Sequence, residues 1–169
     1  MIELTFSVDF TNLTQEYRKD AAKEAEFLAS KIDQAASNGC KTGISVASEN
    51  AGSSVVVNVK VKSANVDNCR VAVWLLEDGI VAAQTGGSST EVHNNVLWAS
   101  SSTVAYGDRI QLDADGAGQN VYRMDVSGAH DLSNCRLVVF TTVPNTSGRF
   151  VVDNVVTCPL DGQTAFEYE

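Results

Sequence analysis

The sequence has no cluster of basic residues and no long apolar run, and these two absences exclude whole classes of function. It holds 12 Lys and Arg against 21 Asp and Glu, so its net charge at pH 7 is −9. Nucleic acids and anionic membrane surfaces are bound through concentrated positive charge, so we expect neither as a partner. No stretch approaches the ~20 consecutive apolar residues of a transmembrane helix. The start, Met1 to Glu3, also lacks the basic flank and apolar core of a signal peptide.

The four cysteines lie far apart in the chain: Cys40, Cys69, Cys135 and Cys158. None of the spacings forms a Cys-x-x-Cys redox pair or a paired zinc motif. The even number is compatible with two disulfides in an oxidising compartment, in any of three pairings. Four buried thiols are the alternative, since free cysteine is among the most buried residue types. The spacing alone selects neither.

The first 39 residues predict a strand followed by one long helix. Residues 2–8 alternate apolar and polar side chains, which is the pattern of a half-buried strand. Thr11 or Asn12 can cap a helix, and Gly39 suits the left-handed position after its end. Between these signals the apolar residues recur in steps of three and four, along one helix face: Leu13, Tyr17, Ala21, Ala25, Leu28, Ile32 and Ala36. Residues 1–39 are therefore expected to form a segment of their own.

From residue 40 to residue 169 the pattern changes to an alternation of period two, interrupted by Gly, Asn and Ser turns, which predicts a mainly β domain. The stretches 69–77 and 135–143 are apolar on both faces, so we place them centrally, with Trp74 in the core. Seven or eight strands with frequent turns favour an antiparallel β-sandwich, immunoglobulin-like or jelly-roll-like. Besides residues 2–8, the expected strands are 43–48, 55–62, 69–77, 107–112, 120–127, 135–143 and 149–158.

A polar group follows the first of these central strands and is the candidate site. Glu77, Asp78 and His93 could act together as metal ligands or in acid–base chemistry, because carboxylate and imidazole groups bind several divalent ions. One His and two adjacent acids are nevertheless a weak metal signature. The alternative is structural: Asp78 lies in a turn, Glu77 is solvated, and the stretch His93-Asn94-Asn95 bonds backbone groups and fixes a loop.

Three further features bear on binding and catalysis. An exposed Trp98 near His93 would create a binding surface, whose candidate residues are His93, Asn94, Asn95 and Trp98.

The run from Asp113 to Asn120 only partly matches a calcium loop, because Met124 stands where the last ligand belongs, so we expect a solvated hairpin loop. No Ser lies in a Gly-x-Ser-x-Gly motif and no cysteine has a His nearby in sequence. We therefore expect no enzyme activity and no cofactor.

Three stretches together carry a resemblance to a known family. The first, residues 76–97, contains Glu-Asp-Gly-Ile-Val, then Gln, then His-Asn-x-Val-Leu. The second is Val-Val-Asp-Asn-Val-Val at 151–156, and the third is the chain end at 162–169. Over residues 40–169 the chain resembles the C-terminal domain of the twenty-eight-kilodalton outer-membrane-protein family, which are cell-envelope lipoproteins of Bacteroidetes.

This resemblance implies an exported protein of the cell envelope, usually lipid-anchored through an N-terminal cysteine that this chain lacks. Where relatives often have His-Asn-His and an Arg after Val-Leu, this chain has Asn95 and Trp98, which puts a ligand role of those positions in doubt. A thioredoxin-like domain precedes the sandwich in many relatives. Residues 1–39 are therefore interpreted as the remnant of such a domain or as a helical cap on the sandwich.

Three hypotheses for function follow. We favour a non-catalytic cell-envelope or outer-membrane lipoprotein domain whose loops or sheet edge contact a protein or a glycan at the cell surface. The second hypothesis is an accessory domain of a thioredoxin-like thiol–disulfide protein, which the missing Cys-x-x-Cys weakens. The third is a metal-dependent hydrolase built on Glu77, Asp78 and His93.

Overall fold

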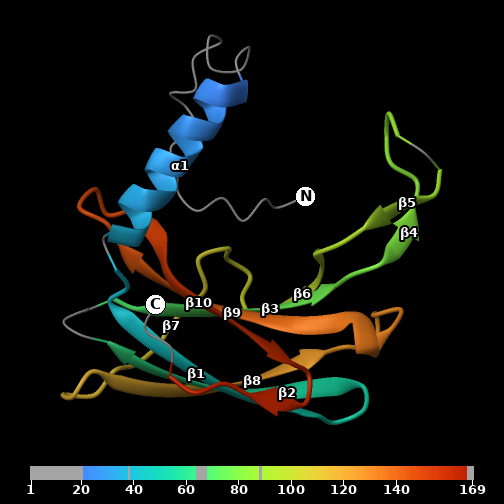
Figure 1. Cartoon of the computed structure of the whole chain (residues 1–169). Coiled ribbons are helices and arrows are strands. Elements are labelled where there is room, and N and C mark those ends of the chain that lie inside the picture. The colour runs from blue at the N-terminus through green and yellow to red at the C-terminus, as the bar shows by residue number, and fades with distance from the viewer. Residues whose placement is uncertain (1–20, 38, 64–67, 88, 167–169) are drawn as a thin grey trace.

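The structure is a computed structural model that describes residues 21–37, 39–63, 68–87 and 89–166. The strand expected at residues 2–8 lies outside the described residues. Helix α1 covers Ala21–Ser37 and has 17 residues, in place of the long helix expected from Leu13, whose earlier positions also lie outside the described part. None of the described α1 side chains is buried, and Ile32 is 62% exposed. The helix projects from one end of the sandwich (Figure 1), and its role as remnant or cap stays a prediction.

One layer of the sandwich is a four-stranded antiparallel sheet with the order β11-β1-β2-β8. Its strands are β1 (Thr42–Asn50), β2 (Ser54–Ser63), β8 (Ala117–Asp125) and β11 (Gly162–Gln163). On β2 the valines at every second position are buried, whereas Lys60 and Lys62 are exposed. This alternation gives the sheet one apolar face and one face in water.

The other layer is an antiparallel sheet with the order β10-β9-β3-β6, in which β7 also pairs with β3. Its strands are β3 (Arg70–Glu77), β6 (Val96–Ser100), β7 (Asp108–Arg109), β9 (Cys135–Pro144) and β10 (Phe150–Pro159). The strands β3 and β9 occupy central positions, as their apolar character on both faces predicted. The strand expected at 107–112 is only the two-residue β7, while β6 was not expected.

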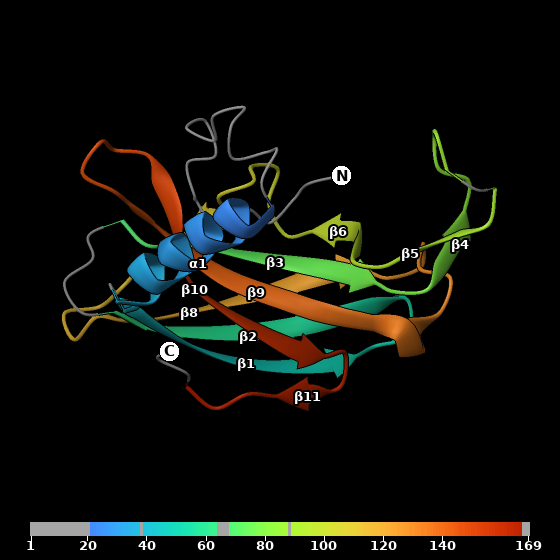
Figure 2. The same cartoon turned by 45° about the horizontal axis from the view of Figure 1, so that its top comes forward.

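A small third sheet stands apart from the two layers. Strands β4 (Ile80–Ala82) and β5 (Glu91–His93) pair with each other in antiparallel register and form a ribbon. The ribbon extends beyond the sandwich at the end opposite α1 (Figures 1 and 2). We call residues 80–93 the arm. Sequence reasoning missed both strands, because each spans only three residues.

The main core lies between the two layers. It joins the buried valines of β2 to Val73 and Leu75 of β3 and to Leu137 and Val139 of β9. A second, smaller cluster occupies the opposite face of β3 and β9 and contains Ala72, Trp74, Leu76, Val138 and Phe140. Full burial of one Val or Leu side chain stabilises the fold by roughly 1.5–3 kcal/mol. The predicted antiparallel β-sandwich with Trp74 in the core is confirmed.

Candidate functional site

Glu77 ends β3, and the candidate site is built around it. Alternation along β3 puts Val71, Val73 and Leu75 on the face that meets the other sheet, and Glu77 continues that face. Glu77 is only 1% exposed. The expectation that Glu77 is solvated is therefore wrong. A carboxylate at the end of a strand can point into the protein where enough hydrogen-bond donors surround it.

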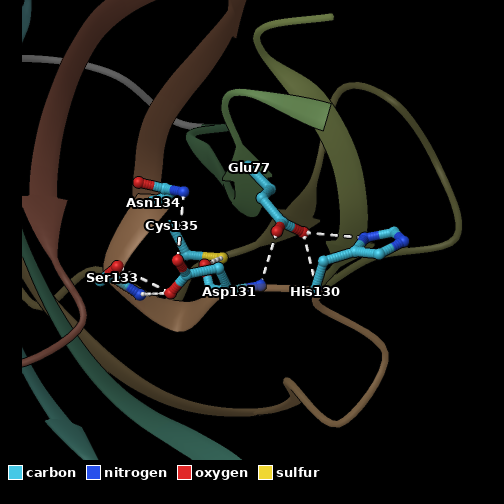
Figure 3. A network of polar contacts seen from close by, with 6 residues as sticks. All are labelled: Glu77, His130, Asp131, Ser133, Asn134 and Cys135. Atoms are coloured by element: carbon cyan, nitrogen blue, oxygen red, sulfur yellow. Dashed lines mark hydrogen bonds and ion pairs between the residues drawn. The ribbon is translucent and has the colours of Figure 1, made fainter. Parts of the chain in front are cut away.

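Donors from two other segments surround the Glu77 carboxylate (Figure 3). The backbone N–H groups of His130 and Asp131 donate to it at 3.0 and 2.7 Å, and His130 Nδ1 lies 3.6 Å from Oε2. Burial by itself raises the pKa of Glu77. The backbone hydrogen bonds, a hydrogen bond from the Trp98 side chain and the electrostatic effect of the nearby His130 outweigh that effect, so the pKa is lowered. Glu77 is consequently an ionised anchor at neutral pH.

The loop that joins β8 to β9 is shaped by its own side chains before it reaches Glu77 (Figure 3). Asp131 caps the short 3-10 helix η3 (Leu132–Asn134), because it accepts bonds from the N–H and the hydroxyl of Ser133 at 2.9 and 2.7 Å. These bonds lower the pKa of Asp131. The Cys135 thiol donates to the Asp131 carbonyl oxygen at 3.4 Å. The loop is therefore a fixed frame for the backbone donors of the site.

Trp98 approaches the site from the edge strand β6. The β3–β6 register shifts between Leu75 and Leu76, so Trp98 is the extra residue of a β-bulge, and a bulge re-aims its side chain. The Trp98 and His130 rings lie 5.1 Å apart at an angle of 54°, and Trp98 is 37% exposed. The sequence singled out Trp98 as an exposed residue near His93. The structure instead pairs it with His130, which comes from a distant loop.

Asp78, Asn94 and Asn95 fix the base of the arm to the sandwich. Asp78 Oδ1 accepts from the Asn95 N–H at 2.7 Å, and Asp78 Oδ2 and Asn95 Oδ1 both accept from the Arg136 guanidinium of β9. Asn94 Oδ1 accepts from the Gly79 N–H at 3.0 Å. Asn95 has a left-handed φ of 58°, which Asn tolerates better than most residues. We call Asp78, Asn95 and Arg136 the base clamp.

His93 does not join Glu77 and Asp78. Its Nε2 lies 3.3 Å from the Ala82 carbonyl oxygen across the ribbon, whereas the two carboxylates are engaged by the β8–β9 loop and by the base clamp. Within residues 21–37, 39–63, 68–87 and 89–166, no three His, Cys, Asp or Glu side chains are grouped so that they could hold a metal ion. The three candidates therefore do not form the metal centre that was one interpretation of the sequence.

Two other polar stretches are also structural. Asp113 Oδ1 accepts from the N–H groups of Asp115 and Ala117, each at 2.9 Å, so the loop before β8 is a turn bonded to itself. Asp153 lies at the register shift of β10, where it accepts from the Lys41 N–H at 2.9 Å and from the Thr42 hydroxyl at 2.6 Å. The Val-Val-Asp-Asn-Val-Val stretch thus ties β10 to the start of β1.

All four disulfide candidates, Cys40, Cys69, Cys135 and Cys158, are free thiols in the structure, and the last three are buried. Burial, with a smaller contribution from the charge of Asp153, raises the pKa of Cys69 to about 12. Burial and neighbouring carboxylates, Glu77 first, raise the pKa of Cys135 to about 11. Burial and then Asp153 also raise the pKa of Cys40. Such thiols are poor nucleophiles at neutral pH, because the thiolate is the reactive form.

The arm carries an apolar pair that the sandwich does not cover. Val81 and Val92 stand directly opposite each other in the β4–β5 register and are 62% and 61% exposed. Cross-strand partners project to the same side of a ribbon, so the two side chains form one apolar surface. The Gly/Ser turn near Gly86, with short β-branched stretches on both sides, was the signal that could have revealed this hairpin.

The comparisons with known proteins can be set beside this geometry. The family model of outer membrane protein Omp28 matches residues 9–163. Among solved structures, HBP35 of Porphyromonas gingivalis is similar, with a TM-score of 0.62 and 13% identity, over 77% of this chain and 45% of that chain. The match thus spans less than half of that structure, and at this identity it shows the fold alone. No curated protein matches the chain.

The family match confirms the predicted resemblance to the outer-membrane-protein family. The described residues contain no helix with the length and apolar character that crossing a bilayer requires.

Proposed function

This chain belongs to the family of outer membrane protein Omp28, and we propose that it serves there as a non-catalytic contact module of an exported cell-envelope lipoprotein. The contact element is the arm, and the partner is a protein. The observation that carries this proposal is the apolar pair Val81 and Val92, exposed on a ribbon that extends beyond the sandwich (Figure 2). Exposed apolar surface on an otherwise well-packed domain is typical of a protein contact.

The rest of the chain favours contact over catalysis. The polar groups of the candidate site make structural contacts. Glu77 accepts hydrogen bonds from two backbone N–H groups, and Asp78 is part of the base clamp. The thiols whose pKa values are raised do not supply a redox nucleophile. A role as accessory domain of a thiol–disulfide protein would therefore not rest on Cys69 or Cys135 as a nucleophile.

A glycan is the second candidate ligand, and one observation favours it. Trp98 is partly exposed beside the largely exposed His130, and aromatic rings offer stacking surfaces to sugar rings. Titration of Trp98 fluorescence with envelope polysaccharide would test this candidate, with Trp98→Phe as the control for signal from Trp74. Absence of a Trp98-dependent change would remove the glycan candidate and leave a protein as the proposed partner.

Site-specific photo-crosslinking tests the protein contact. A photoreactive residue is placed at position 81 of the full chain in its native cell envelope, and at position 121 in a control. Val121 on β8 is 56% exposed, comparable to Val81, but lies outside the arm. We expect one identified protein to be crosslinked from position 81 and not from position 121. Equal crosslinking from both positions, or none from position 81, would contradict the proposed function.

A further inference from the structure

We infer that the partner adds an extended strand to β4 of the arm, with apolar side chains beside Val81 and with Lys or Arg at the ends of the added segment. This inference rests on the proposed function, because it specifies what the arm contacts. It concerns the partner's chemistry and its mode of binding. Addition of a strand to a sheet edge takes its affinity from main-chain hydrogen bonds and its selectivity from alternate side chains.

The arm is an incomplete sheet. In the described part of the chain, β4 and β5 pair with each other and with no third strand. A two-stranded ribbon without a third strand or a packed helix is marginally stable in water. A strand added at β4 would give the ribbon a third strand, and its side chains on the same face would lie beside Val81 and extend the apolar surface that Val81 and Val92 form. The arm therefore gains more from an extended partner segment than from a globular surface that touches only its tip.

The edge of β4 carries no charged side chain, although the strand is short and its Ala82 carbonyl oxygen lies 3.3 Å from His93 Nε2. Its residues Ile80, Val81 and Ala82 carry no charge, and Val81 and Ala82 are exposed. The edge strand β8 of the sandwich differs, because Arg123 and Asp125 are charged and exposed, and Asn120 Oδ1 accepts from the backbone N–H of Val121. Charged side chains are one of the usual protections of an edge. In side-chain charge, β4 is therefore a less protected edge than β8.

The base of the arm is fixed before any partner arrives. Asp78 bonds both the Asn95 N–H and the Arg136 guanidinium, and the Asp78 N–H donates to the Asn134 carbonyl oxygen at 3.1 Å. Binding then does not have to order the stem of the ribbon, and a preorganised element loses less conformational entropy when it binds. The base clamp is thus a positioning device for the β4 edge.

Charge selects the flanks of the partner segment. No Lys or Arg occurs between Arg70 and Arg109, a stretch that includes the whole arm, and the net charge of the chain is −9. A second copy of this chain would bring the same excess of negative charge, which disfavours pairing of two arms. A segment with Lys or Arg at its ends would be attracted, and the attraction would weaken as salt is raised.

Two synthetic peptides test the inference on the intact chain. Both alternate Val with Thr, and they differ only in having Lys or Glu at the ends. Binding is followed through backbone amide shifts and hydrogen exchange. We expect the Lys peptide to protect amides of β4, to bind more weakly in high salt, and to lose about fivefold in affinity on Val81→Thr. The matched control Val121→Thr should leave the affinity unchanged.

Several outcomes would overturn the inference. Equal binding of the Glu peptide would remove the charge selection, protection at β8 would place the added strand elsewhere, and the absence of any β4 protection would remove strand addition. Sedimentation of the free chain as a dimer that Val81→Thr dissolves would identify a second copy as the occupant. Crosslinking from position 81 without peptide protection at β4 would leave the proposed function standing, whereas loss of that crosslink would remove the function itself.

Discussion

The antiparallel strands of the sandwich and of the arm both carry valines, but these valines are buried in the sandwich and exposed on the arm. Val57 and Val59 on β2 and Val73 on β3 are 0% exposed, whereas Val81 and Val92 on the arm are more than 60% exposed. The strands obey the same alternation in both regions. What differs is the opposing layer: each sheet of the sandwich covers the other, while the arm extends past both.

The comparison teaches where this chain places its stability and where it places its contact surface. In the sandwich, the free energy of burial has already been gained within the chain. On the arm, the same apolar surface remains in water and becomes available on association. The base clamp joins the two regions, so the sandwich holds the base of the arm without covering the arm.

The largest effect that would sharpen this comparison concerns thiol reactivity in the covered region. The pKa of Cys69, raised from 9.0 to about 12, lowers its thiolate fraction at pH 8 about a thousandfold. We expect iodoacetamide to label the half-buried Cys40 first in the native protein, and Cys69 only after unfolding. Mass spectrometry of timed samples measures this order, with urea-unfolded protein as the control. Labelling of Cys69 as early as Cys40 would mean that the sandwich is open.

The next effect separates the two regions by stability. Leu75→Ala should lower the free energy of unfolding by about 2–5 kcal/mol, because Leu75 is 0% exposed and its loss leaves a cavity between the sheets. Val81→Ala should change it by less than about 0.5 kcal/mol, as expected for an exposed position. Urea unfolding followed by circular dichroism measures both. A similar cost for the two variants would break the comparison.

A smaller effect tests the frame at the sandwich edge. The lowered pKa of Glu77 means that its contribution to stability is present above its ordinary value of 4.5 and is lost as pH falls through the lower folded value. Glu77→Gln should therefore destabilise the protein at pH 7, by less than Leu75→Ala, and the difference from the parent should shrink below about pH 4.5. Unfolding curves across this pH range measure it. A difference that stays constant with pH would show that the carboxylate charge does not matter.

The layers could be predicted from the sequence because they rest on long, regular patterns. The valines of β2 and the doubly apolar stretches of β3 and β9 indicated their strands and their central or one-sided positions. The ribbon was missed because β4 and β5 have three residues each, too few for a period-two pattern to stand out from a loop. β6 was missed for a related reason, since the bulge at Trp98 interrupts its alternation.

The site was predicted only in part. The sequence located Glu77, Asp78 and the Asn94–Asn95 pair, and the interpretation that the asparagines fix a loop agrees with their bonds to Gly79 and Asp78. It did not connect Glu77 with His130, because that contact is made across the fold by backbone N–H groups, which carry no residue signature. Burial of Glu77 follows from such tertiary donors and could not be read from its neighbours along the chain.

The smallest expected effect, that of Thr substitutions on the arm, gives the sharpest test of the comparison, because the same substitution is also made in the core. Val59→Thr places a hydroxyl in the apolar main core and should cost about 1–3 kcal/mol. Val81→Thr with Val92→Thr keeps two β-branched side chains on the arm and should change the free energy of unfolding by less than about 0.5 kcal/mol. Urea unfolding of the three proteins side by side measures both values. If the arm variant lost as much stability as the core variant, the apolar pair would belong to the folding core, and its exposure would no longer indicate a partner.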